Sequence, residues 1–239
     1  MIGSVVGFFS GLVGKGGSAI TTPALQIFAG INPFAALASP LPATLPTTLS
    51  AFAAYSKKNL INVRVVTGSV LMGIPATFFG AFFSDMISGN ILMILTAIFV
   101  LGLGLSFFTS ENDFETTNKI PRWKIITVAI SVGFLSGLLA NSGGVLFGPL
   151  FIRFLKMPTK EALASSLLVA AGLAVPGTIA HWYLGHIDWQ IVLLLSVSSI
   201  PFSYLGARVA LRLDNKILEK IFGIMLVVFG ALDLWYNIG

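Results

Sequence analysis

Residues 7–17 read GFFSGLVGKGG, and residues 133–143 read GFLSGLLANSG, 126 positions further along the chain. At this offset residues 7–104 align with residues 133–230 without a gap. The alignment keeps rare residue types in step, as in Pro23 with Pro149 and Ser39 with Ser165. Shared membrane composition raises chance identity but does not align such residues over so long a stretch. The chain is therefore predicted to contain an internal duplication.

The composition indicates a protein that crosses a membrane several times. Hydrophobic residues make up 56% of the 239 residues, charged residues only 10%, and the mean hydropathy is +0.93. A soluble domain carries roughly 25% charged residues. So few charged residues and so many apolar ones exclude an ordinary soluble enzyme and a disordered protein. A nucleic-acid binder is also excluded, because the residues behind the net charge of +5 form no basic stripe. The absence of cysteine excludes disulfides and thiolate chemistry. We expect no cofactor and no metal.

The predicted fold class is all-α, because the alternation typical of a membrane β-barrel is absent. No cation precedes Lys15, so no signal peptide is expected. Two segments, 2–28 and 125–154, are broken by glycine-rich stretches, and in the first each arm has only about 10–12 helical residues, half the bilayer thickness. We predict a broken or re-entrant hairpin in each, with its tip at mid-membrane. Spanning helices are expected at 39–55, 63–83, 91–108, 163–182, 189–207 and 217–234, three for each repeat.

The positions of Lys and Arg predict the orientation of the chain. They fall in the loops at 57–64, 119–124, 153–160 and 208–220, whereas the loops at 29–38, 84–90 and 184–188 have none. If each hairpin turns back on itself, all the basic loops lie on one side, which the positive-inside rule makes cytoplasmic. Each repeat then crosses an odd number of times, so the repeats are inverted. We predict a first repeat at 1–108, a cytoplasmic linker at 109–124, a second repeat at 125–239, and both termini outside a cell membrane.

The second arm of each hairpin begins with glycine and serine, which is typical of an anion site. The first N–H groups of a helix have no helical acceptor, its dipole is positive there, and glycine allows close approach to the backbone. Two such tips would meet near the midplane. The predicted substrate-binding residues are Lys15, Gly16, Gly17, Ser18, Ser39, Thr44, Asn141, Ser142, Gly143, Gly144, Ser165 and Ser166.

Each of these residues has a structural alternative. Lys15 would extend to an interface if its tip is shallow, and the glycines would serve helix packing alone. Ser39 and Ser165 are expected to begin helices and would cap them. Thr44 would donate to a carbonyl of its own helix.

The titratable residues favour an anionic substrate. All the acids lie near helix ends or in loops, so no carboxylate pair is expected for cation coordination or acid–base chemistry. This disfavours a cation transporter and an intramembrane hydrolase. His181 precedes Trp182 and Tyr183, which favours the interface belt for it; proton coupling is the alternative.

The motif at 7–23, its copy at 133–149, and the Ala-Leu-Ala-Ser element at 36–39 and 162–165 resemble the sulfite exporter TauE/SafE family of membrane permeases. The resemblance covers nearly the whole chain, although Asn141-Ser142 stand where the first copy has Lys15-Gly16. It implies transport of sulfur-containing anions such as sulfite, sulfoacetate or other organosulfonates.

The expected function is secondary transport of such an anion by alternating access, with no enzymatic activity and no nucleic-acid partner. The partners are the lipid bilayer, the anion and a coupling proton or ion. The alternatives are an anion channel, a transporter of thiosulfate or a carboxylate, and an assembly subunit, which would leave the paired tips without a role.

Overall fold

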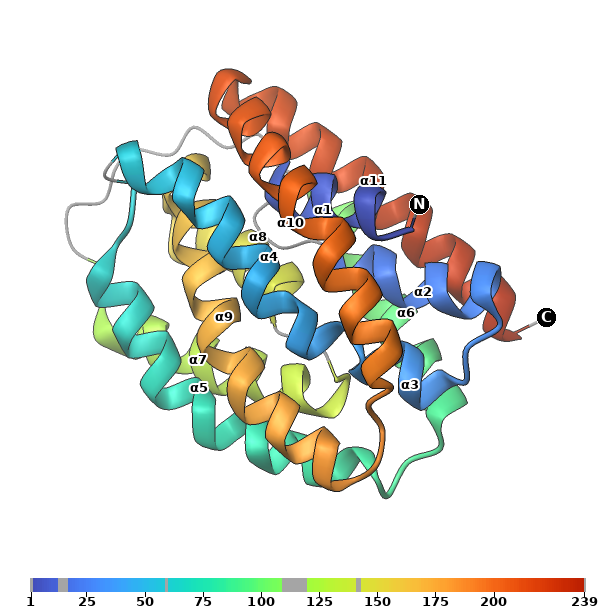
Figure 1. Cartoon of the computed structure of the whole chain (residues 1–239). Helices are drawn as coiled ribbons and strands as arrows, with labels where there is room; N and C mark the ends of the chain where they lie inside the picture. Colours follow the sequence, from blue (N-terminus) through green and yellow to red (C-terminus); the bar gives the residue numbers. More distant parts are fainter. Residues whose placement is uncertain (1, 13–16, 59, 109–119, 141–142, 239) are drawn as a thin grey trace.

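The computed structural model describes residues 2–12, 17–58, 60–108, 120–140 and 143–238, and all the regular secondary structure in them is helical (Figure 1). The helices are α1 (Ile2–Leu12), α2 (Gly17–Ala29), α3 (Pro33–Ala38), α4 (Pro40–Tyr55), the short 3-10 helix η1 (Ser56–Lys58), α5 (Val63–Ser84), α6 (Gly89–Ser106), α7 (Arg122–Leu138), α8 (Gly144–Arg153), α9 (Thr159–Tyr183), α10 (Trp189–Arg212) and α11 (Asn215–Ile238). The predicted all-α class is confirmed.

Four helices, α5, α6, α9 and α10, are long and apolar enough to cross a bilayer. Large apolar side chains on α5 and α10 point out of the helix bundle, as in Phe79 and Leu194, which are 67% and 70% exposed. Such exposure is unfavourable in water and natural in lipid. The protein is therefore a polytopic membrane protein, and the helices expected at 39–55 and 217–234 are present as α4 and α11.

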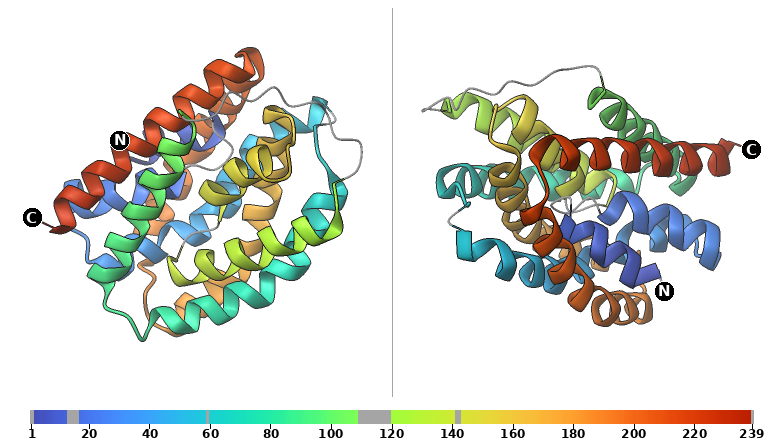
Figure 2. Two further views of the ribbon diagram at one scale, coloured as in Figure 1. Left: turned by 180° about the vertical axis from the view of Figure 1, so that it is seen from behind. Right: turned by 90° about the horizontal axis from the view of Figure 1, so that it is seen from above.

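Both broken segments fold as helical hairpins, as the sequence predicts. Ile2, at the start of α1, packs in one apolar cluster with Leu25 near the end of α2. In the second copy, the ring of Trp123 at the start of α7 lies 6.1 Å from that of Phe154, just after α8. The entrance and exit of each hairpin therefore lie together, so the chain turns back between its two arms (Figure 2).

The first arm of each hairpin packs tightly against a long helix of the other repeat. A Cβ atom added to Gly11 on α1 would lie 1.9 Å from the carbonyl oxygen of Ser203 on α10. A Cβ atom added to Gly137 on α7 would lie 2.0 Å from the carbonyl oxygen of Thr77 on α5. Adding 126 to Gly11 and subtracting it from Ser203 converts the first contact into the second. Three further glycine contacts recur in the same way, each with its partner in the other repeat. They are Gly7 with Ser199 and Gly133 with Gly73, Gly206 with Phe8 and Gly80 with Phe134, and Gly104 with Val227 and Gly230 with Leu101.

Two buried serines make a further pair of exchanged contacts. The backbone N–H of Asp188, which precedes α10, donates to Oγ of Ser39 at 2.9 Å. The backbone N–H of Asn62, which precedes α5, donates to Oγ of Ser165 at 3.1 Å. Each serine therefore fixes the start of a long helix in the other repeat.

The repeats differ at the beginning of their second helix. Ser39 separates α3 from α4, whereas α9 runs from Thr159 without interruption. Pro40 has no N–H to continue a helix, and the aligned residue in the second repeat is Ser166. The prediction that Ser165 and Ser166 begin a helix is therefore wrong. Ser39 makes no side-chain capping bond to α4, so its capping alternative is also wrong.

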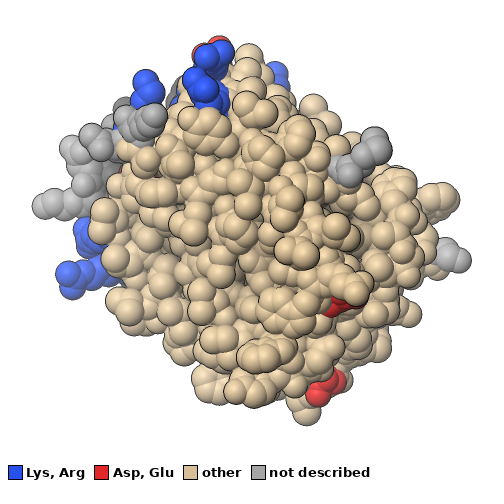
Figure 3. Space-filling view, viewed as in Figure 1, with Lys and Arg blue, Asp and Glu red and all other residues tan. Residues whose placement is uncertain are grey.

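The described charges divide between the two ends of the helix bundle. At one end lie the loop after α5, the loop before α10 and the start of α3. Contacts of His186, in the loop before α10, join them: its ring stacks on Phe34 of α3 at 4.4 Å, and its Nε2 lies 3.7 Å from Asp85 after α5. This end has no Lys or Arg among the described residues. The other end carries Lys58, Arg64, Arg122, Lys124, Arg153, Lys156, Lys160, Arg208, Arg212, Lys216 and Lys220. In Figure 3 most of the visible cations lie toward the upper left and the top, with acid visible among them, whereas the lower right shows acids without cations.

Candidate functional site

The candidate site begins at the breaks of the two hairpins. Gly143 precedes α8 with φ +70°, a left-handed conformation that favours glycine, and an added Cβ would lie 2.8 Å from the ring of Phe147. Its conformation turns the chain into α8, whose first N–H groups lack helical acceptors. Helices α2 and α8, which follow the two breaks, contact each other. The second arms of the hairpins therefore meet inside the protein.

Several predicted binding residues lie at the breaks themselves. Gly17 begins α2 and Gly144 begins α8, as the sequence predicts. Lys15, Gly16, Asn141 and Ser142 lie outside the described residues, and so does the side chain of Ser18.

A small hydroxyl-lined cavity lies beside the first hairpin, between α1, α2, α4 and α10. Its polar lining consists of Ser10, Thr21, Thr47 and Ser199, all at most 4% exposed. The hydroxyls of Thr47 and Ser199 lie 2.6 Å apart and share a hydrogen bond. Ser10 Oγ has no hydrogen-bond partner among the described residues, although it is buried. A buried hydroxyl without a partner is costly, so Ser10 is suited to a bound ligand.

The aligned position in the second repeat is filled with apolar side chains. Phe147 aligns with Thr21, and Leu173 aligns with Thr47. Both are completely buried, and Leu173 packs within 3.0 Å of where a Cβ of Gly73 would lie. The two repeats therefore share a backbone framework, but two hydroxyls of the cavity lining are replaced by apolar side chains in the second.

The predicted residues on α4 and α9 make structural hydrogen bonds. Thr44 donates to the carbonyl of Pro40 at 2.9 Å, which confirms the alternative of bonding within its own helix. Ser39 and Ser165 accept the backbone bonds described above, and Ser166 donates to the carbonyl of Leu163 at 2.9 Å. Anion binding by these four residues stays a prediction, and the structure shows their hydroxyls engaged with the protein.

An aromatic side chain caps the first arm of each hairpin. Tyr55, at the end of α4, donates to the carbonyl of Gly11 at 3.4 Å. His181, near the end of α9, aligns with Tyr55, and its Nε2 donates to the carbonyl of Gly137 at 2.9 Å because a carbonyl only accepts. Both bonds reach carbonyls in the last turn of the first arm, and that of Gly137 also accepts the backbone N–H of Ala140 at 3.2 Å.

His181 therefore does not belong to the interface belt, and that prediction is wrong. It is 1% exposed, whereas its neighbours Trp182 and Tyr183 are 57% and 80% exposed. His181 lies on the inner face of α9 and the two aromatic residues on the outer face. Its Nδ1 lies 3.0 Å from Nδ1 of His186, the only other histidine of the chain.

The sequence also missed the burial of one acid. Asp233 lies near the end of α11, as the sequence indicates, but it is only 2% exposed. It accepts a hydrogen bond from Asn237 at 3.0 Å, and Asn237 in turn exchanges two hydrogen bonds with Gln26 on α2. This polar group joins α11 to the first hairpin. Only its charge, inside an apolar helix, signals it in the sequence.

Comparisons with known proteins agree with this architecture. The family "Sulfite exporter TauE/SafE" matches residues 1–232. A probable membrane transporter protein of Xylella fastidiosa is 27% identical over 98% of this chain and 92% of its own length. The probable membrane transporter protein YunE of Bacillus subtilis is 24% identical over 97% and 94%, and YfcA of Escherichia coli is 21% identical over 100% and 89%. No solved structure matches the chain significantly. The family match spans both hairpins and the helices between them, and the chain is therefore a membrane transporter of the sulfite exporter TauE/SafE family.

Proposed function

We propose that this transporter carries a small sulfur-containing anion, such as sulfite, sulfoacetate or another organosulfonate, by alternating access. The observation that carries the proposal is the cavity beside the first hairpin. Its polar lining is made of hydroxyls, of which Ser10 Oγ has no described partner and could donate to an oxyanion, and no carboxylate lines it. A cation would find no opposite charge in this lining.

The anion binds where the second arms of the hairpins meet. The N–H groups of Gly16, Gly17, Gly143 and Gly144 face it, with Lys15, Ser18, Asn141 and Ser142 beside them. Ser10 supplies a free hydroxyl from the adjoining cavity. Contact between α2 and α8 supports this arrangement, since the two glycine-rich helix starts belong to these helices.

The two repeats, 1–108 and 125–239, are inverted relative to the membrane. Contacts that recur with exchanged partners are what a twofold axis between the repeats produces. The loop after the second helix of the first repeat lies at the cationic end, and its aligned loop at 184–188 lies at the opposite end. The axis therefore lies in the membrane plane, and the linker 109–124 lies at the cationic, cytoplasmic end.

A pocket of about 360 Å³ at the cationic end supports an anionic substrate. It is lined by Lys58, Arg208 and Arg212, together with Tyr204 between α4 and α10. Clustered cations raise the local concentration of anions and speed their capture. This pocket is the cytoplasmic approach to the first hairpin.

The test is uptake of labelled anions into liposomes that contain the purified protein. We expect sulfite or an organosulfonate to be transported and to compete with the other. Ser10→Ala should reduce uptake, because it removes the unpaired hydroxyl of the cavity. Ser69→Ala is the matched control, since Ser69 is also buried without a described partner but lies on α5 away from the cavity.

Three outcomes would contradict the proposal. Transport of a cation or a neutral solute, with none of the anions, would refute the substrate class. Transport of thiosulfate or a short carboxylate alone would refute sulfite and organosulfonates as the substrate but would keep an anionic substrate. A single-channel current far above the turnover of a carrier would refute alternating access and show that the protein is an anion channel.

A further inference from the structure

We propose that His186 and His181 form a proton site, loaded from the end of the protein opposite the cations, which places a positive charge beside the break of the second hairpin. The inference rests on the proposed function, because it assigns the coupling ion of the anion transporter. It follows from a continuous path of polar groups. The path runs from an open pocket to the carbonyl in the last turn of α7.

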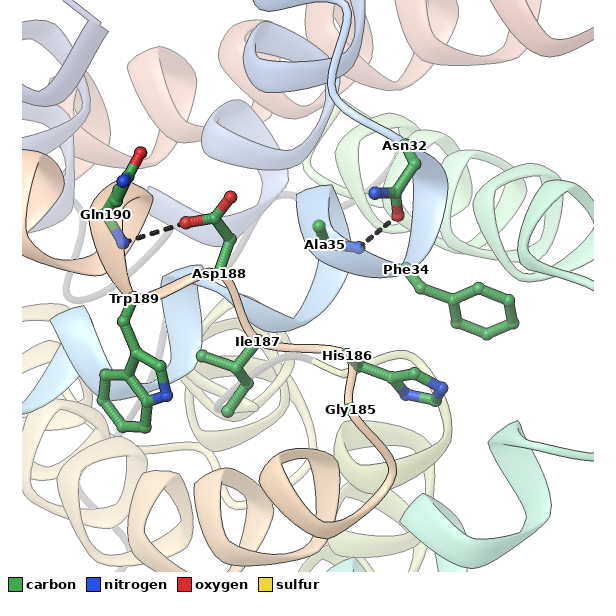
Figure 4. Close-up of a pocket in the computed structure, with 9 residues that line it drawn as sticks. All are labelled: Asn32, Phe34, Ala35, Gly185, His186, Ile187, Asp188, Trp189 and Gln190. Carbon is green, nitrogen blue, oxygen red and sulfur yellow. Dashed lines mark hydrogen bonds between the residues drawn. The ribbon is translucent and has the colours of Figure 1, made fainter.

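The path begins at a pocket of about 540 Å³ at that end of the bundle. Its lining includes Asn32 and Phe34 at the start of α3, and His186, Asp188 and Gln190 in the loop before α10 and its first turn (Figure 4). The His186 ring stacks against Phe34, and its Nε2 lies 3.7 Å from the Asp85 carboxylate, whose side chain is 60% exposed. Water therefore reaches the outer edge of an imidazole that is otherwise buried.

The hydrogen bonds determine which nitrogen of each ring carries a proton. Nε2 of His181 must donate to the carbonyl of Gly137, so in the neutral ring Nδ1 is the acceptor. Nδ1 of His186 must then donate across the 3.0 Å contact. The remaining basic nitrogen of the pair is Nε2 of His186, which faces Asp85. The structure therefore offers one place for an incoming proton, at the edge of the pocket.

The proton step follows from this arrangement. A hydronium ion in the pocket protonates Nε2 of His186 and leaves as water. His186 then passes the proton on its Nδ1 to Nδ1 of His181, and its ring becomes the neutral tautomer with the proton on Nε2. His181 is now an imidazolium that donates from both nitrogens. The carbonyl of Gly137 cannot take up a proton, so the charge stays on His181 of α9, beside the last turn of α7.

Few other charges act on the pair. From α5 the facing group is Asp85, and from the loop before α10 it is Asp188, whose carboxylate accepts the N–H groups of Gln190 and Ile191. The contacts from α3 and α7 are the uncharged Phe34 ring and Gly137 carbonyl. Burial lowers the pKa of His186 and the Asp85 carboxylate raises it, with burial the larger effect. The neutral pair is thus the resting state, and a proton stays when a negative charge arrives nearby.

The anion supplies that negative charge. Gly137 lies six residues before Gly143, the residue that precedes α8, and the proposed anion site lies at the start of that helix. An imidazolium at His181 therefore stabilises the bound anion, and the anion stabilises the imidazolium. This reciprocal effect couples the two ligands.

The histidine pair can be observed directly, because the chain has no other histidine. Protein labelled with ¹⁵N-histidine, carrying no histidine tag, is reconstituted in lipid for solid-state NMR at several pH values. We expect one ring with its proton on Nδ1 and one with its proton on Nε2 at neutral pH, and one proton taken up by the pair on acidification. Two rings with the same tautomer, or rings that titrate independently, would overturn the proposal.

Transport provides the second measurement. In liposomes containing a pH-sensitive dye, acid on the histidine side should speed anion entry, and the dye should report proton entry with it. His181→Gln keeps an amide donor for Gly137 but cannot titrate, so both effects should disappear while downhill anion flux remains. His186→Gln should also abolish proton entry and the effect of acid while anion flux remains. This second variant tests the proposal even if His181→Gln does not fold. Tyr55→Phe removes the equivalent cap in the first repeat and should leave proton entry unchanged.

The two proposals fail in different ways. Anion entry without proton entry in the unmodified protein would refute the coupling and leave the anion transporter standing. Absence of anion flux would refute the proposed function, and the NMR measurement would still decide whether the proton site exists.

Discussion

Replacing Gly137 by alanine tests the packing between the repeats. The added Cβ would lie 2.0 Å from the carbonyl oxygen of Thr77, about 1.4 Å inside the 3.4 Å at which ordinary contact begins. Because that atom is backbone, it cannot rotate away, and α7 must move from α5. Overpacking of this kind typically costs 1–3 kcal/mol, and we expect about 3 kcal/mol here.

The matched control is Gly102→Ala on α6. A Cβ at Gly102 would have no atom within 4 Å, so alanine there gains up to about 1 kcal/mol of helix propensity. The two variants should therefore differ by about 4 kcal/mol. For a chain of this size that corresponds to a difference in Tm of roughly 8–16 °C.

The assay is thermal unfolding of the purified protein in detergent, followed by tryptophan fluorescence. Gly11→Ala should match Gly137→Ala, because its Cβ would lie 1.9 Å from the carbonyl of Ser203 in the exchanged contact. If Gly137→Ala melts at or above Gly102→Ala, the close contact between α5 and α7 is refuted.

Three further predictions concern topology, the contact between repeats and pH. Because the chain has no cysteine, Asp85→Cys and Lys58→Cys can be labelled singly in right-side-out vesicles; an impermeant reagent should reach the first from outside and the second only after permeabilisation. Ser165→Ala leaves the N–H of Asn62 unpaired and should lower the unfolding free energy by about 1 kcal/mol, measured as a lower Tm. Acidification should lower Tm, because the folded pKa of His186 lies below its ordinary value of 6.5 and the unfolded chain binds more protons. This contribution to stability is present above pH 6.5 and is lost below it, and His186→Gln should weaken the dependence.

The sequence predicted the hairpins because their signals are local. Glycines break each apolar segment, and a fixed offset of 126 residues reveals the second copy. Both hairpins are present in the structure, as α1–α2 and α7–α8. The start of α9 differs from the prediction, because Ser166 stands where the first repeat has Pro40 and the helix continues through this position.

Contacts between the repeats were harder to foresee. The offset shows that Ser39 and Ser165 are equivalent, but not that each lies against the other repeat. The inner face of α9 cannot be read from the sequence, because the middle of that helix is apolar on all sides and most of it is buried. His181 was therefore assigned by its neighbours Trp182 and Tyr183 rather than by its own face.

The exchanged contacts explain why the two repeats can differ in chemistry. The glycine contacts and serine bonds that hold the repeats together occur in both, so the remaining aligned positions are free to diverge without loss of the framework. At the cavity, Thr21 in the first repeat corresponds to Phe147 in the second, so a hydroxyl of the lining is replaced by an apolar ring. At the hairpin caps the second repeat has the polar group that can titrate, because Tyr55 of the first repeat stays neutral at ordinary pH and His181 of the second can take a proton. In the proposed mechanism the first repeat supplies hydroxyls to the anion and the second supplies the compensating charge, so neither repeat alone would couple the two ligands.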